Sequence, residues 1–555
     1  MLDLLAMLEG RLPGPHSSRE HAVGEERFER SADRGLLLGV AVLLLAGLVL
    51  LLGYGYGRDQ GIYAVVARAI AGGGAPYLDA WDFKPPAIFG VYAAAHALFG
   101  PGIEAVRGVE ALVYLSLVPA FMLLSDRVLG DSRPGLLAAA IALFAQLQLE
   151  YWDTAQPESF GGVAVVWALF LAVRAEDVAG AARGRARLGA GALYAVAGLF
   201  KPHLGAGILV SAALAARGAR RSGAAAWPPL LVYAAGAALV IAVAAAWLAA
   251  AGAWSATLET FLVFLPSYHS LRFELLALPV DTLRTLRDAL LGFTAFVPVG
   301  LLLLVVLPPL ASRERGVALH VAGVVLFQLA GVASQARFYP YHFAASLTLL
   351  ALPAGWGLWK GWLRARHSPL GVVAALTAAI LLAWKTPAVP AYGGLGFWER
   401  ARLRGALLAG GADAGVENLL HTAGDVHYGA NRGAANWIAT RTPPDSALYV
   451  WGFEPMLYAM ADRRPASRWI YNVPQRLAWE HRDRVRRELL ADLRREKPAA
   501  IVVLQRDVRE GVTGNDRDSR AELEAFPELG QLLDEAYAPG WTGEDLTILL
   551  RRPTE

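Results

Sequence analysis

The sequence predicts a helical protein that crosses a membrane many times and ends in a smaller α/β domain. Hydrophobic residues make up 55% of its 555 residues and charged residues 18%, a balance too apolar for an ordinary soluble protein. An uncharged apolar run at 36–54 is long enough to cross a bilayer core of about 30 Å at about 1.5 Å per residue. After about residue 387, charge becomes dense and the apolar runs become short.

The membrane part, residues 35–386, is expected to hold about eleven spans. Apolar segments recur along it at 36–54, 103–124, 134–150, 159–173, 188–200, 203–216, 228–250, 290–310, 317–333, 341–362 and 369–386. The segments at 188–200 and 203–216 are short. They predict a helical hairpin that enters the membrane and returns beside sheltering neighbours.

The lysines and arginines of the short loops predict the orientation, because cytoplasmic loops carry an excess of them. The rich loops hold Arg127 and Arg133; Arg174, Arg183, Arg185 and Arg187; Arg217, Arg220 and Arg221; Arg313 and Arg315; and Lys360, Arg364 and Arg366. Residues 1–34 are then a cytoplasmic tail in a protein of the cell inner (plasma) membrane.

The loops that are poorer in cations, at 55–102, 151–158, 251–289 and 334–340, are expected outside, together with everything after 387. The loop at 251–289 departs from the pattern through Arg272, Arg284 and Arg287. An amphipathic surface segment that could act as a flexible lid is expected there.

Residues 387–555 are expected to form an extracytoplasmic α/β domain. ALYVWGF at 447–453, AAIVVL at 499–504 and LTILL at 546–550 are typical of buried strands. The stretches 482–496 and 519–537 are typical of the helices between them. Such alternation of strands and helices predicts the α/β class.

Several functions are excluded or disfavoured. No basic patch is interleaved with aromatic residues, so nucleic acid is not an expected partner. The chain has no cysteine, which excludes disulfides and thiolate chemistry. Before residue 387 there is no P-loop, HExxH, GxSxG or dinucleotide fingerprint. No cofactor is expected; a divalent cation shared by Asp59, Asp153 and Glu158 is the alternative if the fold brings them together.

The first outer loop carries the densest chemical signal. Asp59 follows the first span closely and is either a carboxylate that takes a proton from an acceptor hydroxyl or the N-cap of a helix that begins near Ile62. Further on, DAWDFKPP places Lys84 before two prolines, which fix the backbone at this point. A lysine ammonium held in place in this way suits a lipid phosphate. The alternative is a surface pair of Asp82 with Lys84 at a helix start.

The second outer loop, YWDTAQPE, carries Asp153 and Glu158. Either could serve as an acidic site for substrate or cation. Either could also cap the next helix, where a carboxylate benefits from the helix dipole. Capping is the expectation for Asp153, and both interpretations stay open for Glu158.

Two further segments add cations to the outer side. Lys201 in KPH interrupts the short hairpin and either reaches a phosphate or extends to the interface. RFYPYH offers Arg337, Tyr339 and His342 as donors to phosphate, or as an interfacial aromatic belt. Together with Arg58, these cations on the cation-poor side favour an anionic substrate.

The first loop, RDQGIYAVVARAIAGGGAPYLDAWDFKPP, resembles that of the C-type (GT-C) membrane glycosyltransferases. It is most similar to bacterial members of glycosyltransferase family 39, the protein O-mannosyltransferase and aminoarabinose-transferase (ArnT-like) group. QPESF, LFKPH, RFYPYHF and WGFEPMLYAMADRRPASR are similar to other positions of such proteins. The resemblance covers roughly residues 35–555.

The resemblance implies the GT-C fold, a polyprenyl-phosphate sugar donor within the membrane lipid, an outside acceptor (protein, lipid or glycan) and inverting transfer. Asp59 would activate the acceptor. The donor phosphate would be held by Lys84 and Arg337, with Lys201 and His342. Substrate would contact Arg58, Asp82, Glu158 and Tyr339.

One departure from the family pattern is visible, because many relatives have Asp-Glu where this chain has Asp59-Gln60. Asp59 is retained, but any role that needs the neighbouring charge is in doubt.

Two other functions stay open on the sequence. A transporter or flippase of lipid-linked saccharides would use the same lipid and cations, although paired repeats with broken helices are not evident. A non-enzymatic assembly or export partner would use only the outer α/β domain.

Overall fold

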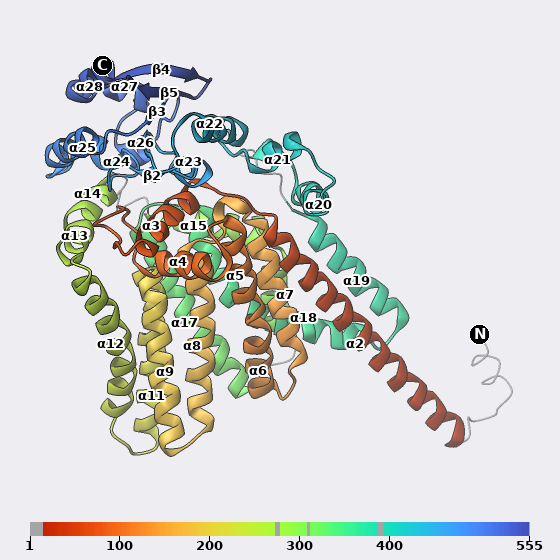
Figure 1. Ribbon diagram of the computed structural model, residues 1–555. Helices are drawn as coiled ribbons and strands as arrows, with labels where there is room; N and C mark the ends of the chain where they lie inside the picture. Colours follow the sequence, from red (N-terminus) through yellow and green to blue (C-terminus); the bar gives the residue numbers. More distant parts are fainter. Residues whose placement is uncertain (1–14, 272–277, 308–310, 387–391, 554–555) are drawn as a thin grey trace.

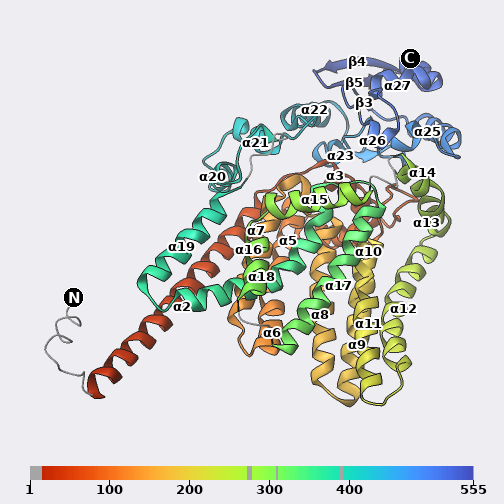
Figure 2. The ribbon, with the colours of Figure 1, turned by 180° about the vertical axis from the view of Figure 1, so that it is seen from behind.

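Long helices packed side by side form the membrane part of the protein (Figure 1, and from behind in Figure 2). The computed structural model describes residues 15–271, 278–307, 311–386 and 392–553. The bundle helices are α2 (Pro15–Leu52), α5 (Ile103–Leu115), α6 (Leu117–Leu129), α7 (Arg133–Gln148), α8 (Pro157–Asp177), α9 (Gly180–Phe200), α11 (Gly207–Arg221), α12 (Trp227–Ala250), α16 (Phe296–Val306), α17 (Ser312–Ser334), α18 (Ala344–Ala365) and α19 (Pro369–Trp384). We call the end that carries the C-terminal domain the domain end, and the opposite end the far end.

Within the described ranges, five helices are long and apolar enough to cross a membrane: Glu26–Leu52, Ile103–Leu129, Pro157–Asp177, Trp227–Ala250 and Ser312–Ser334. A bent pair, Pro279–Gly292 with Phe296–Val306, adds a sixth if it counts as one span; its helices meet at 96°. The other predicted segments also fall on helices, some of them too short or too polar to pass that test. Eleven spans therefore stay a prediction.

The hairpin predicted at 188–216 is longer than its apolar segments. Its first helix, α9, has 21 residues because it includes the arginine-bearing stretch from Gly180 onward, and α11 has 15 residues. The break comes at Lys201, whose backbone is extended before Pro202, and the short α10 (Pro202–Gly205) turns the chain. Likewise α2 begins at Pro15, so the described part of the predicted tail is helical.

The predicted surface segment at 251–289 is confirmed in part. It forms α13 (Trp254–Glu259), a π-helical turn η2 (Thr260–Phe264), α14 (Leu265–Ser270) and α15 (Leu278–Gly292). In α15, Arg284 and Arg287 are exposed whereas Ala289 is buried, as in an amphipathic helix. Arg272 lies outside the described residues, and the lid stays a prediction.

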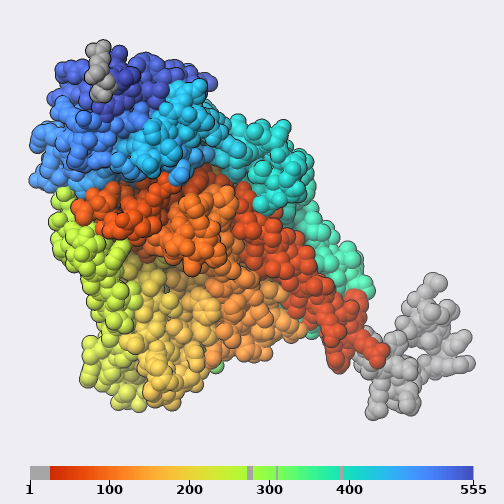
Figure 3. All heavy atoms as spheres, in the orientation of Figure 1, coloured from red at the N-terminus to blue at the C-terminus, as the bar shows by residue number. Residues whose placement is uncertain are grey.

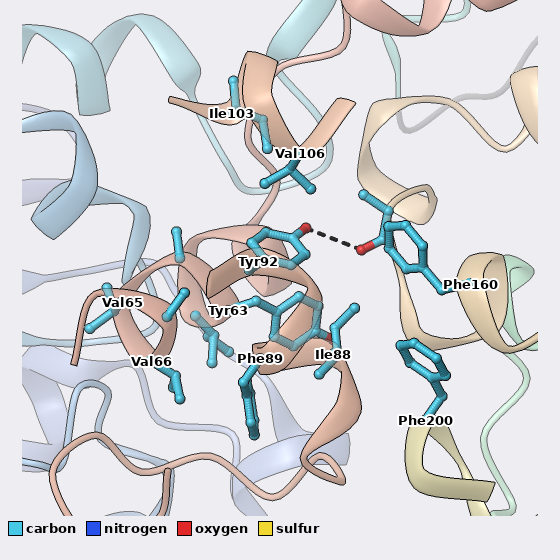
Figure 4. Close-up of a cluster of buried hydrophobic side chains, with 14 of the residues drawn as sticks. Tyr63, Val65, Val66, Ile88, Phe89, Tyr92, Ile103, Val106, Phe160 and Phe200 are labelled. Carbon is cyan, nitrogen blue, oxygen red and sulfur yellow. Dashed lines mark hydrogen bonds between the residues drawn. The ribbon is translucent and has the colours of Figure 1, made fainter. Parts of the chain in front are cut away.

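Two helices of the segment between α2 and α5, α3 (Arg58–Ala71) and α4 (Ala87–Phe99), lie across the domain end. Their facing sides are fully buried around Tyr63, Phe89 and Tyr92 (Figure 4). The ring centroids of Tyr63 and Tyr92 are 5.3 Å apart, and the Tyr92 hydroxyl donates to the Ala155 carbonyl at 3.1 Å. This core fixes α3 against the loop that precedes α8.

The C-terminal domain contains a five-stranded sheet in the order β2-β1-β3-β5-β4. β1 pairs in parallel with β2 and β3, whereas β5 is antiparallel to β3 and β4. The three predicted strands are confirmed. The strands are β1 (Ala447–Trp451), β2 (Arg464–Pro465), β3 (Ala500–Leu504), β4 (Tyr537–Thr542) and β5 (Leu546–Arg551).

Most helices of this domain lie beside and beneath the sheet, whereas α20 and α21 lie to one side, next to the end of α19 (Figure 1). They are α20 (Phe397–Leu408), α21 (Ala414–His421), α22 (Tyr428–Arg441), α23 (Met456–Met460), α24 (Val473–Arg476), α25 (Arg482–Glu496), α26 (Glu510–Thr513), α27 (Ser519–Glu522), η5 (Leu523–Ala525) and α28 (Pro527–Ala536). The predicted helix at 482–496 has the predicted bounds. The one at 519–537 is interrupted, because the residue before Pro527 leaves the helical conformation.

The C-terminal domain lies on the segment that carries α3 and α4 (Figure 3). α3 and α23 approach so closely that a Cβ added at Gly61 would lie 2.6 Å from the Met456 backbone nitrogen. The Trp81 amide donates to the Arg468 carbonyl at 2.8 Å, which ties the loop between α3 and α4 to the domain. The loop that carries the candidate residues is therefore held between the bundle and the domain.

Candidate active site

Asp59 lies in the first turn of α3, which begins at Arg58 with Gly57 as its N-cap residue. The interpretation of Asp59 as the cap of a helix beginning near Ile62 is therefore wrong. A first-turn carboxylate still gains from the positive end of the helix dipole. Its Oδ2 accepts a hydrogen bond from Gln156 Nε2 at 3.2 Å and lies 3.9 Å from Lys84 Nζ. The side chain is 24% exposed, so a substrate can reach it.

Asp82 holds the backbone around Lys84 rather than pairing with its ammonium. Its Oδ2 accepts from the Lys84 amide at 3.2 Å, and its Oδ1 accepts from the Tyr471 hydroxyl of the C-terminal domain at 2.7 Å. Asp82 is 1% exposed, so the predicted surface pair is wrong. Burial raises the pKa of Asp82, and the neighbouring Lys84 opposes this. These hydrogen bonds likewise do not favour a direct contact between Asp82 and a substrate.

Glu158 and Lys201 form a buried ion pair beside Asp59. Glu158 lies in the first turn of α8, and its Oε1 is 2.5 Å from Lys201 Nζ. Lys201 also donates to Gln335 Oε1 at 3.1 Å, and the Nε2 of His342 lies 4.0 Å from Glu158. Lys201 does not extend to the interface, because it is only 6% exposed.

Tyr341, which is not among the site residues predicted from the sequence, lies between the two lysines. Its ring centroid is 5.7 Å from Lys84 Nζ and 5.2 Å from Lys201 Nζ. The neighbouring Tyr339, predicted to bind substrate, is 37% exposed and stacks on Tyr341 with centroids 5.8 Å apart. In RFYPYH the second tyrosine, not the first, therefore joins Asp59, Lys84, Glu158 and Lys201, and we call these five residues the cluster.

Arg337 is buried near the cluster, but its guanidinium already donates hydrogen bonds to two backbone carbonyls. Its guanidinium donates to the Tyr268 carbonyl at 2.8 Å and to the Gly511 carbonyl, and it stacks 3.8 Å from the Tyr268 ring centroid. Burial lowers the pKa of His269 to about 4, with Arg337, Lys201 and Lys84 acting in the same direction. The charges of all three cations therefore reach His269, although the Arg337 guanidinium already holds the surrounding loops.

His342 links Arg337 to the cluster. Its Nδ1 is 2.7 Å from the Arg337 carbonyl oxygen, and its Nε2 faces Glu158. The residue therefore lies between Arg337 and the Glu158–Lys201 pair, and its contact with a donor phosphate stays a prediction.

Arg58 has a different role from the predicted contact with an anionic substrate. It is buried, 2.5 Å from Glu454 Oε1 and 3.2 Å from Asp425 Oδ2, both in the C-terminal domain. Its guanidinium also lies between the rings of Trp152 and Phe453, at 5.6 and 5.0 Å. These contacts neutralise its charge and join α3 to the domain, which corrects the sequence-based expectation.

Asp153 is buried in the 3-10 turn η1 (Tyr151–Asp153) and caps no helix, since the N-cap of α8 is Gln156. Burial raises the pKa of Asp153 well above its usual range, and the charges of Asp59 and Glu158 act in the same direction. No group of three or more His, Asp or Glu side chains within the described ranges is arranged to hold a metal ion.

A cavity of about 180 Å³ opens near the site without including it. It lies between α3, α4 and the C-terminal domain and is lined in part by Arg68, His96 and Tyr458. None of the cluster residues lines it. The candidate site is therefore defined by its side chains and not by this cavity.

No protein-family model and no curated protein matches the sequence. The fold, however, is similar to that of ArnT from Cupriavidus metallidurans. The structure of ArnT bound to undecaprenyl phosphate has a TM-score of 0.57 at 17% identity, covering 93% of this chain and 97% of that chain. The apo structure has a TM-score of 0.53 at 18% identity, covering 94% and 98%.

A more distant likeness, with a TM-score of 0.46 at 14% identity, is to the apo oligosaccharyltransferase of Archaeoglobus fulgidus; it covers 84% of this chain and 69% of that chain. The ArnT likeness extends over nearly the whole length of both chains. This chain therefore has the GT-C glycosyltransferase fold of ArnT, in a multi-pass membrane protein with a small C-terminal sheet domain.

Proposed function

We propose that the protein is a membrane glycosyltransferase that moves a sugar from a polyprenyl-phosphate carrier to an acceptor at the domain end. The observation that carries the proposal is the meeting of Asp59 with two lysines, Lys84 and Lys201, around Tyr341. These residues come from four separate segments. The similar fold of ArnT, which was solved with undecaprenyl phosphate, supports a lipid-linked donor.

The arrangement suits an inverting displacement. The lysines hold the donor phosphate, with Arg337 and His342 behind them, and the acceptor hydroxyl attacks the anomeric carbon from the opposite face. Its proton passes to Asp59, while the bond from that carbon to the phosphate oxygen breaks and its electrons remain on the polyprenyl phosphate. A phosphate leaving group needs little acid help, so fixed cations and one base are sufficient.

The distribution of cations supports an outside location for this site. The arginine-rich turns between α6 and α7, α8 and α9, and α11 and α12 lie at the far end (Figure 1). Because such turns are retained in the cytoplasm, the domain end faces outward from the inner membrane in this proposal. The acceptor can be a protein, a lipid or a glycan.

A proteoliposome experiment tests the proposal against the transporter alternative. The purified protein is reconstituted with polyprenyl-phosphate sugar labelled in the sugar and supplied with an envelope extract as acceptor. We expect label in a new glycosidic product, reduced about 10²- to 10⁴-fold in Asp59→Asn. Asp462→Asn, which alters a side chain that is 84% exposed, is the matched control and should transfer normally. Movement of labelled lipid between leaflets without any transfer would instead identify a flippase.

A further inference from the structure

A chain of two buried side chains leads into Asp59. Asp59 and Tyr63 are four residues apart on α3 and so lie on the same face of the helix. Both reach Gln156, the residue before α8: the Tyr63 hydroxyl donates to Gln156 Oε1 at 2.9 Å, and Gln156 Nε2 donates to Asp59 Oδ2 at 3.2 Å. Tyr63 and Gln156 are 0% and 1% exposed.

The surroundings allow only one orientation of the Gln156 amide. In that orientation Nε2 faces two acceptors, Asp59 and the Trp152 carbonyl at 3.3 Å, while Oε1 faces the Tyr63 hydroxyl. A reversed amide would set its oxygen against a carboxylate and a carbonyl, and these acceptors would repel one another. Burial raises the pKa of Tyr63, and the charge of Asp59 adds to this, so the hydroxyl keeps its proton and stays a donor.

We propose that Gln156 is the positioning residue of the acceptor-activating carboxylate, with Tyr63 fixing the orientation of its amide. This inference rests on the proposed function. Gln156 and Lys84 both approach Oδ2, so they leave Oδ1 of Asp59 to take the acceptor proton. The Gln156 amide thereby holds the Asp59 carboxylate in one rotamer. Gln156 lies at the start of α8, and the first turn of the same helix carries Glu158, which pairs with Lys201.

The molecule contains a matched control for this arrangement. In the bundle core the Tyr114 hydroxyl donates to Gln146 Oε1 at 2.7 Å, and Gln146 Nε2 donates to Glu110 Oε1 at 2.9 Å. All three side chains are buried, whereas in the first set Tyr63 and Gln156 are buried and Asp59 is 24% exposed. Removing the Tyr114 hydroxyl therefore disturbs a buried Tyr–Gln–carboxylate chain that makes no direct bond to Asp59. Its Glu110 touches the same loop through the Ala155 amide, which donates to Glu110 Oε1 at 2.7 Å.

The test uses the full-length protein in the transfer assay with four variants: Gln156→Met, which keeps the side-chain length without the donor, Tyr63→Phe, their double variant, and Tyr114→Phe. We expect Gln156→Met to lower kcat about 10- to 100-fold, with KM for the donor within about twofold. Tyr63→Phe should lower kcat about 3- to 10-fold. The double variant should equal Gln156→Met alone, since Tyr63 acts through Gln156. Tyr114→Phe should stay within about twofold of wild type.

Three results would overturn the inference. One is a Gln156→Met variant with normal kcat. Another is a Gln156→Met variant whose entire loss of kcat/KM comes from a higher KM for the donor, which would place Gln156 in donor binding. The third is a double variant whose losses multiply, which would make the two side chains independent packing residues. Each presupposes that wild-type transfer depends on Asp59; transfer that is unaffected by Asp59→Asn would instead contradict the proposed function itself.

Discussion

Lys201 should set the alkaline limit of the reaction. Burial lowers the pKa of its ammonium to about 8, with Lys84 acting in the same direction and Glu158 opposing it. The ammonium is therefore present below that pH and lost above it. At a pKa of about 8, the charged fraction is about 90% at pH 7 and about 10% at pH 9. If this charge holds the donor phosphate, kcat/KM for the donor should fall about tenfold per pH unit above pH ~8.

The assay is the pH profile of kcat/KM, which reports the free enzyme, for wild type and Lys201→Arg. Arginine stays charged across this range, so the alkaline decline should disappear in the variant. Lys360→Arg is the matched control, because Lys360 forms a similar 2.5 Å pair with Glu314 elsewhere in the bundle. Its profile should match the wild type. An alkaline decline that persists unchanged in Lys201→Arg would refute the reasoning.

The junction between α3 and the C-terminal domain yields two further predictions, each measured by thermal unfolding of the solubilised protein. Arg58→Met leaves Glu454 buried without its ionic partner and should lower the free energy of unfolding by about 3–5 kcal/mol. Arg68→Met breaks an exposed pair and should lower it by less than about 1 kcal/mol. Equal effects of the two substitutions would contradict this reasoning. Gly61→Ala forces α3 away from α23 and should lower the free energy of unfolding by about 1–3 kcal/mol. A Cβ added at Gly90 would meet no atom within 4 Å, so Gly90→Ala should be neutral or stabilising. An unchanged Tm for Gly61→Ala would show that the contact between α3 and α23 is loose.

Much of the fold could be predicted from local pattern. Long apolar runs indicate helices and short apolar runs bounded by polar residues indicate buried strands. Elements such as α8, α12, β1 and β3 could therefore be located from their own residues. Breaks were harder to predict. The extent of α9 was missed because its arginine-bearing start is helical without being apolar.

Part of the candidate site could also be predicted. Asp59, Lys84, Glu158 and Lys201 were expected on one side of the membrane, and the structure brings them into one cluster. Charge in an apolar chain is costly, which makes such residues visible in the sequence.

The partners of these residues were not visible. Arg58 pairs with Glu454, which lies 396 residues away, and no local pattern announces that pairing. Tyr341 and Gln156 were missed because an aromatic and an amide in a loop are also typical of interfacial belts and turns. Their importance depends on which atoms surround them after folding, and only the three-dimensional packing supplies that information.

The most direct test of the central claim is the release of polyprenyl phosphate from a panel of polyprenyl-phosphate sugars. Membranes containing wild type or Asp59→Asn are compared side by side, with crude envelope as acceptor and protein levels matched. We expect release from at least one donor by wild type and a loss of about 10²- to 10⁴-fold in the variant. Equal release by both proteins would contradict the role given to Asp59, and with it the assignment of this site as the centre of transfer.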